Sequence, residues 1–269
     1  MRTLVHLSDL HFGRVDADLL EPLRAAVAAA EADIVVVSGD LTQRAKAAEF
    51  EQARAFLDRL PRPQLVVPGN HDVPLYRVWE RLLSPLGKYR RFIEGDLEPS
   101  FVDDEIAVVG INTARSLTFK NGRINGEQME AIRSRFDPLD ESVLKVVVTH
   151  HPFDLPDQPG DADLVGRAKA AMDVFSRCGV DLLLAGHLHT SEAGSTEARH
   201  EIAGYSALFV QAGTATSTRG RGEQNSFNVL RLHSRRIEVE RMSWRVETKS
   251  FAHEGSEHFA RDGARWVEC

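Results

Sequence analysis

The chain of 269 residues is poor in cysteine. Its two cysteines, Cys178 and Cys269, cannot build a disulfide framework. The first residues pass directly into a strand-like run, without the basic and apolar regions of a secretory signal peptide. We therefore expect a protein of the reducing cytoplasm.

Long apolar runs are also missing. The longest bursts, such as residues 34–37 and 182–185, are far shorter than the roughly 20 apolar residues that cross a bilayer. We therefore expect a soluble protein without a membrane partner. Because 42% of the residues are hydrophobic, the chain can still fill one large core.

An excess of positive charge is absent as well. The 40 acidic and 33 basic residues give a formal net charge of -7. Such a balance argues against a protein that coats nucleic acid or an anionic membrane through its overall field. We do not expect extended nucleic acid as a partner, and an anionic substrate would have to be attracted locally.

Short apolar bursts alternate with helix-like stretches in the first part of the chain, which is the rhythm of an α/β fold. Strands are expected at residues 3–7, 34–37, 64–67, two within 100–112, 143–149 and 180–185, and helices at 16–32, 45–60, 126–136 and 165–178. After Gly186 the helical pattern ends, and strands at 205–212, 227–233 and 237–244 predict a second, more antiparallel sheet. We expect residues 1–246 to form one domain of two packed sheets with helices outside. The tail 247–269 shows no clear pattern, and its role stays open.

Five of the expected strands end in residues that can bind a metal. The blocks are Asp9-Leu10-His11, Gly39-Asp40, Gly69-Asn70-His71-Asp72, His150-His151 and Gly186-His187-Leu188-His189. Ligand sites of open α/β sheets form at the carboxyl ends of strands, so these groups could converge. The pairs Asp9 and His11, and His187 and His189, would point to one side in extended backbone. Glycine before Asp40, Asn70 and His187 would permit sharp turns and close approach.

The candidate ligands comprise four imidazoles, two carboxylates and one amide: Asp9, His11, Asp40, Asn70, His150, His187 and His189. Seven ligands are too many for one open site but suit two divalent ions, with one carboxylate bridging, roughly 3.5 to 4 Å apart. Imidazole and carboxylate ligands without thiolate fit Mn, Fe, Zn or Co better than Ca or Mg, without choosing among the four. Of these ions we expect Mn or Fe, with Zn or Co as alternatives. Two such ions carry four positive charges and the two carboxylates cancel two. The site would therefore keep a positive charge, which predicts that it binds phosphate.

These ordered blocks resemble the five motifs of calcineurin-like metallophosphoesterases over roughly residues 1–190. Bacterial class III cyclic nucleotide phosphodiesterases are the most similar in the Asp-Leu-His opening, the run Gly39 to Thr42 and the Gly-His-x-His close. The resemblance implies a four-layer α-β-β-α sandwich, with two mixed sheets flanked by helices and a dinuclear site at the strand ends. It also implies that Asp40 bridges two ions and that a metal-bridging hydroxide attacks phosphorus in line.

The same resemblance assigns individual roles. One ion would be held by Asp9, His11, Asp40 and His189, and the other by Asp40, Asn70, His150 and His187. Asn70 and His71 would contact the substrate phosphate, and His71 could also protonate the leaving oxygen. Asp72 could orient His71, or it could only cap the segment that follows.

Several residues outside the ligand set have two interpretations. His151 could contact the substrate or pack behind the ligands. Arg44 could reach a substrate phosphate or be an exposed residue at a helix start, and the run Thr218 to Gly222 could line the site or be a turn. His6 is expected in the core and His200 at the surface, and the apolar residues Trp79, Leu82, Leu83, Leu86, Tyr89 and Phe92 are expected in the core.

Differences from relatives narrow the substrate. Ser/Thr protein phosphatases carry an Asp and an Arg-Gly after the Gly-Asp motif, where this chain has Gln43-Arg44-Ala45. The chain is also too acidic for a nuclease with a broad basic surface. A compact phosphodiester is the best remaining substrate, and a 3',5'-cyclic nucleotide is the most specific candidate within that class. The alternatives are a phosphomonoesterase, a nuclease or a non-catalytic scaffold, and the chain could act as a monomer or a homodimer.

Overall fold

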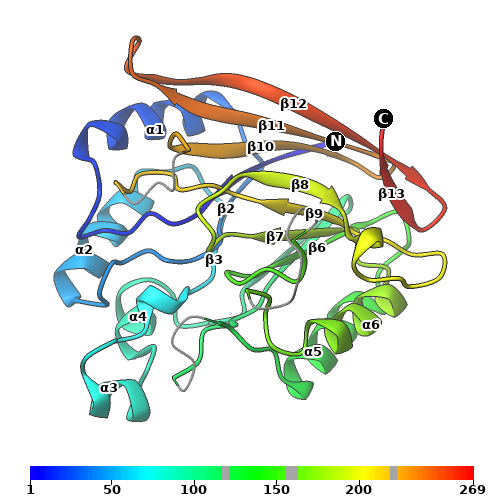
Figure 1. The fold of residues 1–269 in the computed structure, drawn as a ribbon, viewed down its shortest axis with the longest axis horizontal. Helices are drawn as coiled ribbons and strands as arrows, with labels where there is room; N and C mark the ends of the chain where they lie inside the picture. Colours follow the sequence, from blue (N-terminus) through cyan, green and yellow to red (C-terminus); the bar gives the residue numbers. More distant parts are fainter. Residues whose placement is uncertain (117–120, 156–162, 219–222) are drawn as a thin grey trace.

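A computed structural model describes residues 1–116, 121–155, 163–218 and 223–269 (Figure 1). The first sheet has seven strands in the order β13-β12-β11-β10-β1-β2-β3 and the second has six in the order β4-β5-β6-β7-β9-β8. The first contains β1 (Arg2–Leu7), β2 (Ile34–Val37), β3 (Gln64–Val66), β10 (Ser226–His233), β11 (Arg236–Arg245), β12 (Ser250–Asp262) and β13 (Arg265–Glu268). The second contains β4 (Ser100–Val102), β5 (Ile106–Gly110), β6 (Leu144–Val148), β7 (Leu182–Ala185), β8 (Glu192–Ser195) and β9 (Leu208–Gln211).

Both sheets are mixed. In the first, β1, β2 and β3 are parallel, while β10 pairs antiparallel with β1 and begins an antiparallel series to β13. In the second, β5, β6, β7 and β9 are parallel, with antiparallel strands β4 and β8 at the two edges. The carboxyl ends of the parallel strands therefore supply two neighbouring rows of loops, one from each sheet.

Helices cover the outer face of each sheet. The helices of the described residues are α1 (Ala17–Ala29), α2 (Ala47–Leu57), α3 (Val78–Leu83), α4 (Gly87–Phe92), α5 (Gly126–Phe136) and α6 (Ala168–Cys178), with short 3-10 helices η1 (Asn70–Asp72) and η2 (Thr196–Ala198). Leu23 of α1 and Phe56 of α2 pack on the first sheet, and Ile132 of α5 and Phe175 of α6 pack on the second. A third apolar cluster lies between the sheets. The expected four-layer α-β-β-α sandwich is confirmed.

Helix α1 illustrates how sequence pattern becomes structure. Leu19, Leu23 and Val27 recur at helical spacing and are buried, so one face of the helix enters the core. A side-chain oxygen of Asp16 accepts a hydrogen bond from the backbone N–H of Asp18 at 3.1 Å, which caps the first turn. The helix ends at Ala29, three residues before the expected end.

The expectation that the strands after Gly186 form a separate antiparallel sheet is wrong. Strands β8 and β9 join the sheet of β4 to β7, whereas β10 to β13 extend the sheet that β1 begins. Val5 of β1, for example, is opposite Val229 of β10. Periodicity identifies strands but not their partners, because pairing is decided by contacts between residues far apart in the chain.

The C-terminal segment, which has no clear sequence pattern, forms β12 and β13 at one edge of the first sheet. Trp266 of β13 is 1% exposed and lies in the cluster between the sheets. Its indole Nε1–H donates to Oδ1 of Asp181 at 3.2 Å. The segment therefore completes the core of its own chain.

The segment around α3 departs from the expected core. Leu86 and Tyr89 are buried as expected, and Phe92 packs partly buried against the core. Trp79 and Leu83, however, are 77% and 81% exposed, and Leu82 is also exposed.

Within the described ranges, no helix combines the length and the apolar character that a bilayer crossing requires.

Candidate metal centre

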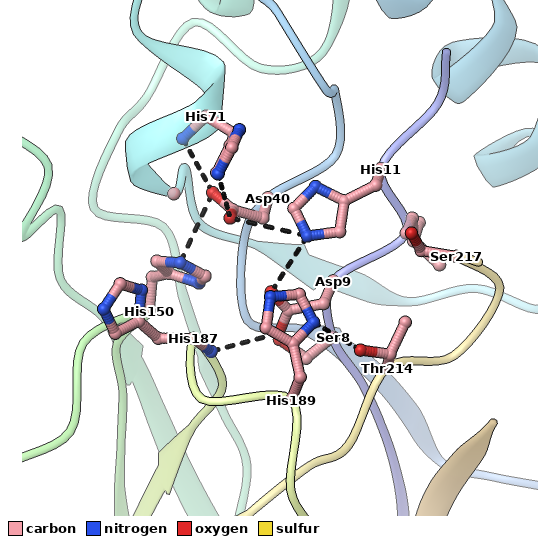
Figure 2. A network of polar contacts seen from close by, with 12 residues as sticks. Ser8, Asp9, His11, Asp40, His71, His150, His187, His189, Thr214 and Ser217 are labelled. Atoms are coloured by element: carbon pink, nitrogen blue, oxygen red, sulfur yellow. Dashed lines mark hydrogen bonds and ion pairs between the residues drawn. The ribbon is translucent and has the colours of Figure 1, made fainter. Parts of the chain in front are cut away.

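The expected ligands come together where strands from both sheets end (Figure 2). Asp9 and His11 follow β1, Asp40 follows β2, and Asn70 and His71 lie in η1 after β3. The second sheet adds His150 after β6 and His187 and His189 after β7. Residues from positions 9 to 189 thus share one site.

Distances between side-chain atoms define two overlapping groups. In the first, Nε2 of His11 lies 3.3 Å and Nε2 of His189 lies 3.7 Å from Oδ1 of Asp9. In the second, Nε2 of His150 lies 3.3 Å from Oδ1 of Asp40 and 3.2 Å from Oδ1 of Asn70.

Asp40 and His187 link these groups to the rest of the site. Oδ2 of Asp40 is 3.7 Å from Nε2 of His11, so Asp40 stands between the two groups. The rings of His150 and His187 have centroids 5.2 Å apart.

The backbone presents these side chains differently from the expectation. Asp9, His11, Asp40, His187 and His189 have φ values of 54°, 50°, 52°, 79° and 62°. All five are therefore in the left-handed region, which residues with a Cβ rarely adopt. The expectation that the Asp9/His11 and His187/His189 pairs sit in extended backbone is wrong. Tight turns after the strands aim them, and such strain is typical of functional sites.

Glycines allow these turns to approach one another closely, as expected. A Cβ on Gly69 would lie 2.1 Å from Oδ1 of Asp40 and 2.4 Å from its backbone nitrogen. A Cβ on Gly186 would lie 1.9 Å from Oγ of Ser8. Gly39, at a φ of +96°, would bring a Cβ to 2.9 Å from the backbone nitrogen of Gly69. Any larger residue would push the loops that carry the ligands apart.

Neighbouring groups hold the imidazoles by their Nδ1 atoms. Nδ1 of His150 is 2.8 Å from the carbonyl oxygen of Ser38, and Nδ1 of His189 is 2.5 Å from Oγ1 of Thr214. Since a carbonyl can only accept, His150 must donate from Nδ1, which leaves Nε2 facing the carboxylates. This orientation is the one that metal binding through Nε2 requires.

Thr214 and Ser8 are contacts that the sequence reasoning missed. Oγ of Ser8 donates to Oδ2 of Asp9 at 2.7 Å, and the backbone N–H of His187 donates to the same oxygen at 3.0 Å. These bonds leave Oδ1 of Asp9 for the site. Thr214 follows β9, so the same search for polar residues at strand ends could have found it.

The electrostatics of the site keep its carboxylates charged. Burial alone would raise the pKa of Asp9, but the nearby imidazoles of His189 and His11 outweigh it and lower that pKa. Burial likewise opposes ionisation of Asp40, yet the charges of His150 and His71 lower its pKa well below the usual value. Conversely, although burial lowers the pKa of His150, Asp40 raises it to about 9. Two buried carboxylates thus hold nearby positive charge.

The donor set fits divalent ions. Oδ1 of Asp9 and Nε2 of His11 are buried and 3.3 Å apart, yet neither has a hydrogen-bond partner in the described part of the chain. Asp9, His11 and His189 place one ligand atom each within 4.8 Å of one another, and so do Asp9, Asp40 and His150. Buried polar atoms without partners are costly, and a shared cation would satisfy them.

His71 lies at the accessible edge of the site. Its side chain is 18% exposed, and its Nε2 is 4.0 Å from Oδ2 of Asp40. Its backbone N–H donates to Oδ1 of Asp40 at 2.8 Å, and its Nδ1 is 2.9 Å from the carbonyl oxygen of Gln43. The ring is thereby turned with Nε2 toward the two groups of ligands.

Asp72 is buried beneath His71. Its carboxylate accepts hydrogen bonds from the backbone of Leu41, Thr42 and Gly69 and from Oγ1 of Thr42. Burial, followed by the charge of Asp40, raises its pKa to about 6. These contacts tie the loop after β2 to η1, and none of these partners lies in the segment that follows Asp72.

The remaining candidates differ in accessibility. His151 is 1% exposed, its Nδ1 is 2.8 Å from Oγ1 of Thr113, and its ring centroid is 4.7 Å from that of His187. This burial favours packing behind the ligands over substrate contact. Arg44 is exposed next to Gln43. Of the run Thr218 to Gly222, which could line the site or be a turn, residues 219–222 lie outside the described residues.

Two other histidines, His6 and His200, are both buried. His6 is buried as expected, with Nε2 2.9 Å from Oγ of Ser38. His200 is not at the surface as expected: it is 9% exposed, and its Nε2 is 3.0 Å from the carbonyl oxygen of Phe153.

A four-layer sandwich that gathers buried imidazoles and carboxylates at its strand ends is the arrangement of a dinuclear metal site. The chain belongs to the calcineurin-like phosphoesterase family, whose model matches residues 2–191.

Curated relatives are similar over parts of their length. A probable cyclic nucleotide phosphodiesterase of Synechococcus sp. is 27% identical over 120 residues, which are 45% of this chain and 42% of that protein. An uncharacterized protein, YpbG of Bacillus subtilis, is 26% identical over 191 residues, or 70% of this chain and 61% of that one. The glycerophosphodiester phosphodiesterase GpdQ of Enterobacter lignolyticus is 37% identical over 82 residues, or 26% of this chain and 29% of that one. Each match spans less than two thirds of the relative.

Solved structures agree in fold. A dimetal phosphatase from Danio rerio superposes with a TM-score of 0.67 at 14% identity, covering 94% of this chain and 98% of that chain. A purple acid phosphatase from yellow lupin gives a TM-score of 0.72 at 13% identity, covering 97% of this chain and 54% of that chain.

Proposed function

We propose that the protein is a metal-dependent phosphodiesterase that hydrolyses a compact phosphodiester. The observation that carries this proposal is the gathering of the seven candidate ligands in overlapping groups at the strand ends, with His71 at the open edge. A scaffold without catalysis would not need buried carboxylates and imidazoles in this arrangement, since unpaired buried charge costs stability.

Two divalent ions would be shared among the seven ligands. Asp9, His11 and His189 would hold the first, Asn70, His150 and His187 the second, and Asp40 both. When bound, the ions would supply the charge that polarises a phosphoester and acidifies water. We propose Mn or Fe as the ions, with Zn or Co as alternatives, since imidazole and carboxylate ligands accept all four.

His71 would act on the substrate itself. Gln43 holds its Nδ1, so Nε2 faces the site, and a proton on Nε2 could pass to the leaving oxygen. Asp72 would serve by bracing the loop that carries His71 and Asp40. We expect the exposed Arg44 to approach the substrate and the buried His151 to support His187.

A cyclic nucleotide is the most specific candidate that we propose for the substrate. The probable cyclic nucleotide phosphodiesterase of Synechococcus sp. supports this choice through its similarity to the chain.

The two cysteines are unpaired, one buried and one exposed, which is compatible with a protein of the cytoplasm.

The test is hydrolysis by metal-stripped, Mn-reloaded protein of bis(p-nitrophenyl) phosphate and of the matching monoester, followed by a panel of cyclic nucleotides. We expect metal-dependent cleavage of the diester above that of the monoester, and its loss in His71→Ala. Preference for the monoester would replace the proposal with a phosphomonoesterase, and no turnover with metals bound would favour a scaffold.

A further inference from the structure

The candidate metal centre is open to the surface on one side. Asp9, His11, Asp40 and His150 are at most 1% exposed, whereas Asn70 is half-buried and the side chain of His71 is 18% exposed. A substrate whose phosphate reaches the buried ligands must therefore leave its remaining groups over the edge formed by Asn70 and His71. Residues beside His71 are positioned to choose among substrates.

Arg44 and Tyr76 form a pair beside that edge. The carbonyl of Gln43 holds the ring of His71, and Arg44 is the next residue. The backbone N–H of Arg44 donates to Oε2 of Glu49 at 2.7 Å, which fixes the loop. The guanidinium carbon of Arg44 lies 5.7 Å from the centroid of the Tyr76 ring, within the range of a cation–π contact.

Tyr76 has this contact with Arg44, yet its side chain is exposed to solvent. It is 77% exposed, so the core does not explain its position. A guanidinium over the ring restrains its orientation and leaves a flat aromatic surface in solvent. Flat aromatic surfaces bind planar rings by stacking, and base–aromatic stacking needs no particular base.

We propose that Tyr76, braced by Arg44, is a specificity residue that stacks on the nucleobase of a nucleotide substrate. The proposal rests on the proposed phosphodiesterase function and narrows its substrate class to nucleotides. The positive charge of Arg44 would also attract the anionic substrate to a protein whose net charge is -7.

Trp79 provides a matched control. It is also aromatic, it lies three residues further along the chain in α3, and it is likewise 77% exposed. Among the residues that the structure describes, the guanidinium of Arg44 lies over the ring of Tyr76 and not over that of Trp79. A general loss of exposed aromatic surface would therefore affect Trp79→Ala and Tyr76→Ala equally.

The experiment measures binding to the Mn-loaded protein of two ligands that differ by a base, adenosine 5'-monophosphate and ribose 5-phosphate. We expect wild type to bind the nucleotide more tightly. Tyr76→Ala should weaken nucleotide binding about tenfold, within the range of base–aromatic stacking, and leave ribose 5-phosphate unchanged. Tyr76→Phe and Trp79→Ala should keep the wild-type preference.

Three results would overturn the proposal: no preference for the nucleotide in wild type, equal weakening of both ligands in Tyr76→Ala, or equal effects of Tyr76→Ala and Trp79→Ala. Turnover of bis(p-nitrophenyl) phosphate by the same wild-type sample distinguishes failure of the stacking role of Tyr76 from failure of the phosphodiesterase function. With turnover intact, these results reject only the stacking role, whereas absence of turnover rejects the phosphodiesterase function and the stacking proposal with it.

Discussion

At the scale of single residues, the site depends on the direction in which each imidazole points. Ser38, Gln43 and Thr214 each contact the Nδ1 of one histidine, so that Nε2 faces the carboxylates. Two of these contacts use backbone carbonyls, which a substitution cannot remove. Thr214 is the exception, because its contact to His189 uses a side chain.

Replacing Thr214 by Val keeps the shape of the side chain and removes the hydroxyl. We expect Thr214→Val to weaken binding of the ion held by His189 by about 10- to 100-fold, since groups behind metal ligands commonly contribute this much. Thr214→Ser keeps the hydroxyl and should bind almost as wild type. Calorimetric titration of the metal-free proteins with Mn measures both. Equal affinities in all three proteins would contradict the assigned contact.

Protons and metal ions compete for His150. In the metal-free protein, burial lowers the pKa of His150, but the opposite effect of Asp40 is larger, so the pKa is raised to about 9. At neutral pH an incoming ion must therefore displace a proton. We expect apparent Mn affinity to rise with pH up to about 9, by about tenfold per unit for one proton released. Calorimetry in buffers of different ionisation enthalpy counts the protons, and a pH-independent affinity without proton release would contradict this.

At the scale of elements, tight turns after the strands bring the ligands together. The carboxyl ends of β1, β2 and β7 are each followed by ligands at positive φ. Such turns can pack against one another only where glycine leaves room, as Gly69 does beside Asp40. The geometry of the site is therefore a property of the loops as much as of the ligands.

The substitution Gly69→Ala tests this dependence. Its Cβ would overlap both Oδ1 and the backbone nitrogen of Asp40, and backbone cannot move aside cheaply. We expect a loss of about 1–3 kcal/mol in the free energy of unfolding, together with weaker metal binding. Gly126→Ala is the control, because nothing lies within 4 Å of its Cβ. Urea denaturation that finds both variants as stable as wild type would contradict the close approach.

The C-terminal strands are a second element with a definite role. Trp266 fills space between the sheets and donates to Asp181. We expect Trp266→Ala to destabilise the fold by about 3–5 kcal/mol, as for other buried aromatic residues. Val246→Ala, at a position 66% exposed, should change stability by less than about 0.5 kcal/mol. The two unfolding curves measure this, and similar midpoints would show that the tail is dispensable.

At the scale of the whole molecule, the sequence predicts the strands that precede the ligands, the helices α1, α2, α5 and α6 to within a few residues, and the convergence of the ligands, but not the strands β8, β12 and β13. Helix α5, for example, spans residues 126–136 as expected. These successes share a cause: apolar periodicity and residues at strand ends are local signals.

Long-range features could not be predicted in the same way. Whether β10 pairs with β1, whether Trp266 is buried, and which hydroxyl contacts His189 all depend on residues more than 20 positions apart. The left-handed turns at Asp9 and His11 were missed because neither residue is glycine. The exposed Trp79 was missed because apolar spacing does not reveal which face of a helix has a partner.

We propose that two ions at this site make the chain a phosphodiesterase. The most direct measurement titrates metal-free protein with Mn and records bound ions and hydrolysis of bis(p-nitrophenyl) phosphate in the same samples, beside Asp40→Asn. We predict that hydrolysis rises as the second ion binds and that Asp40→Asn loses most of it while remaining folded. Hydrolysis without metal, or normal turnover in Asp40→Asn, would contradict the account.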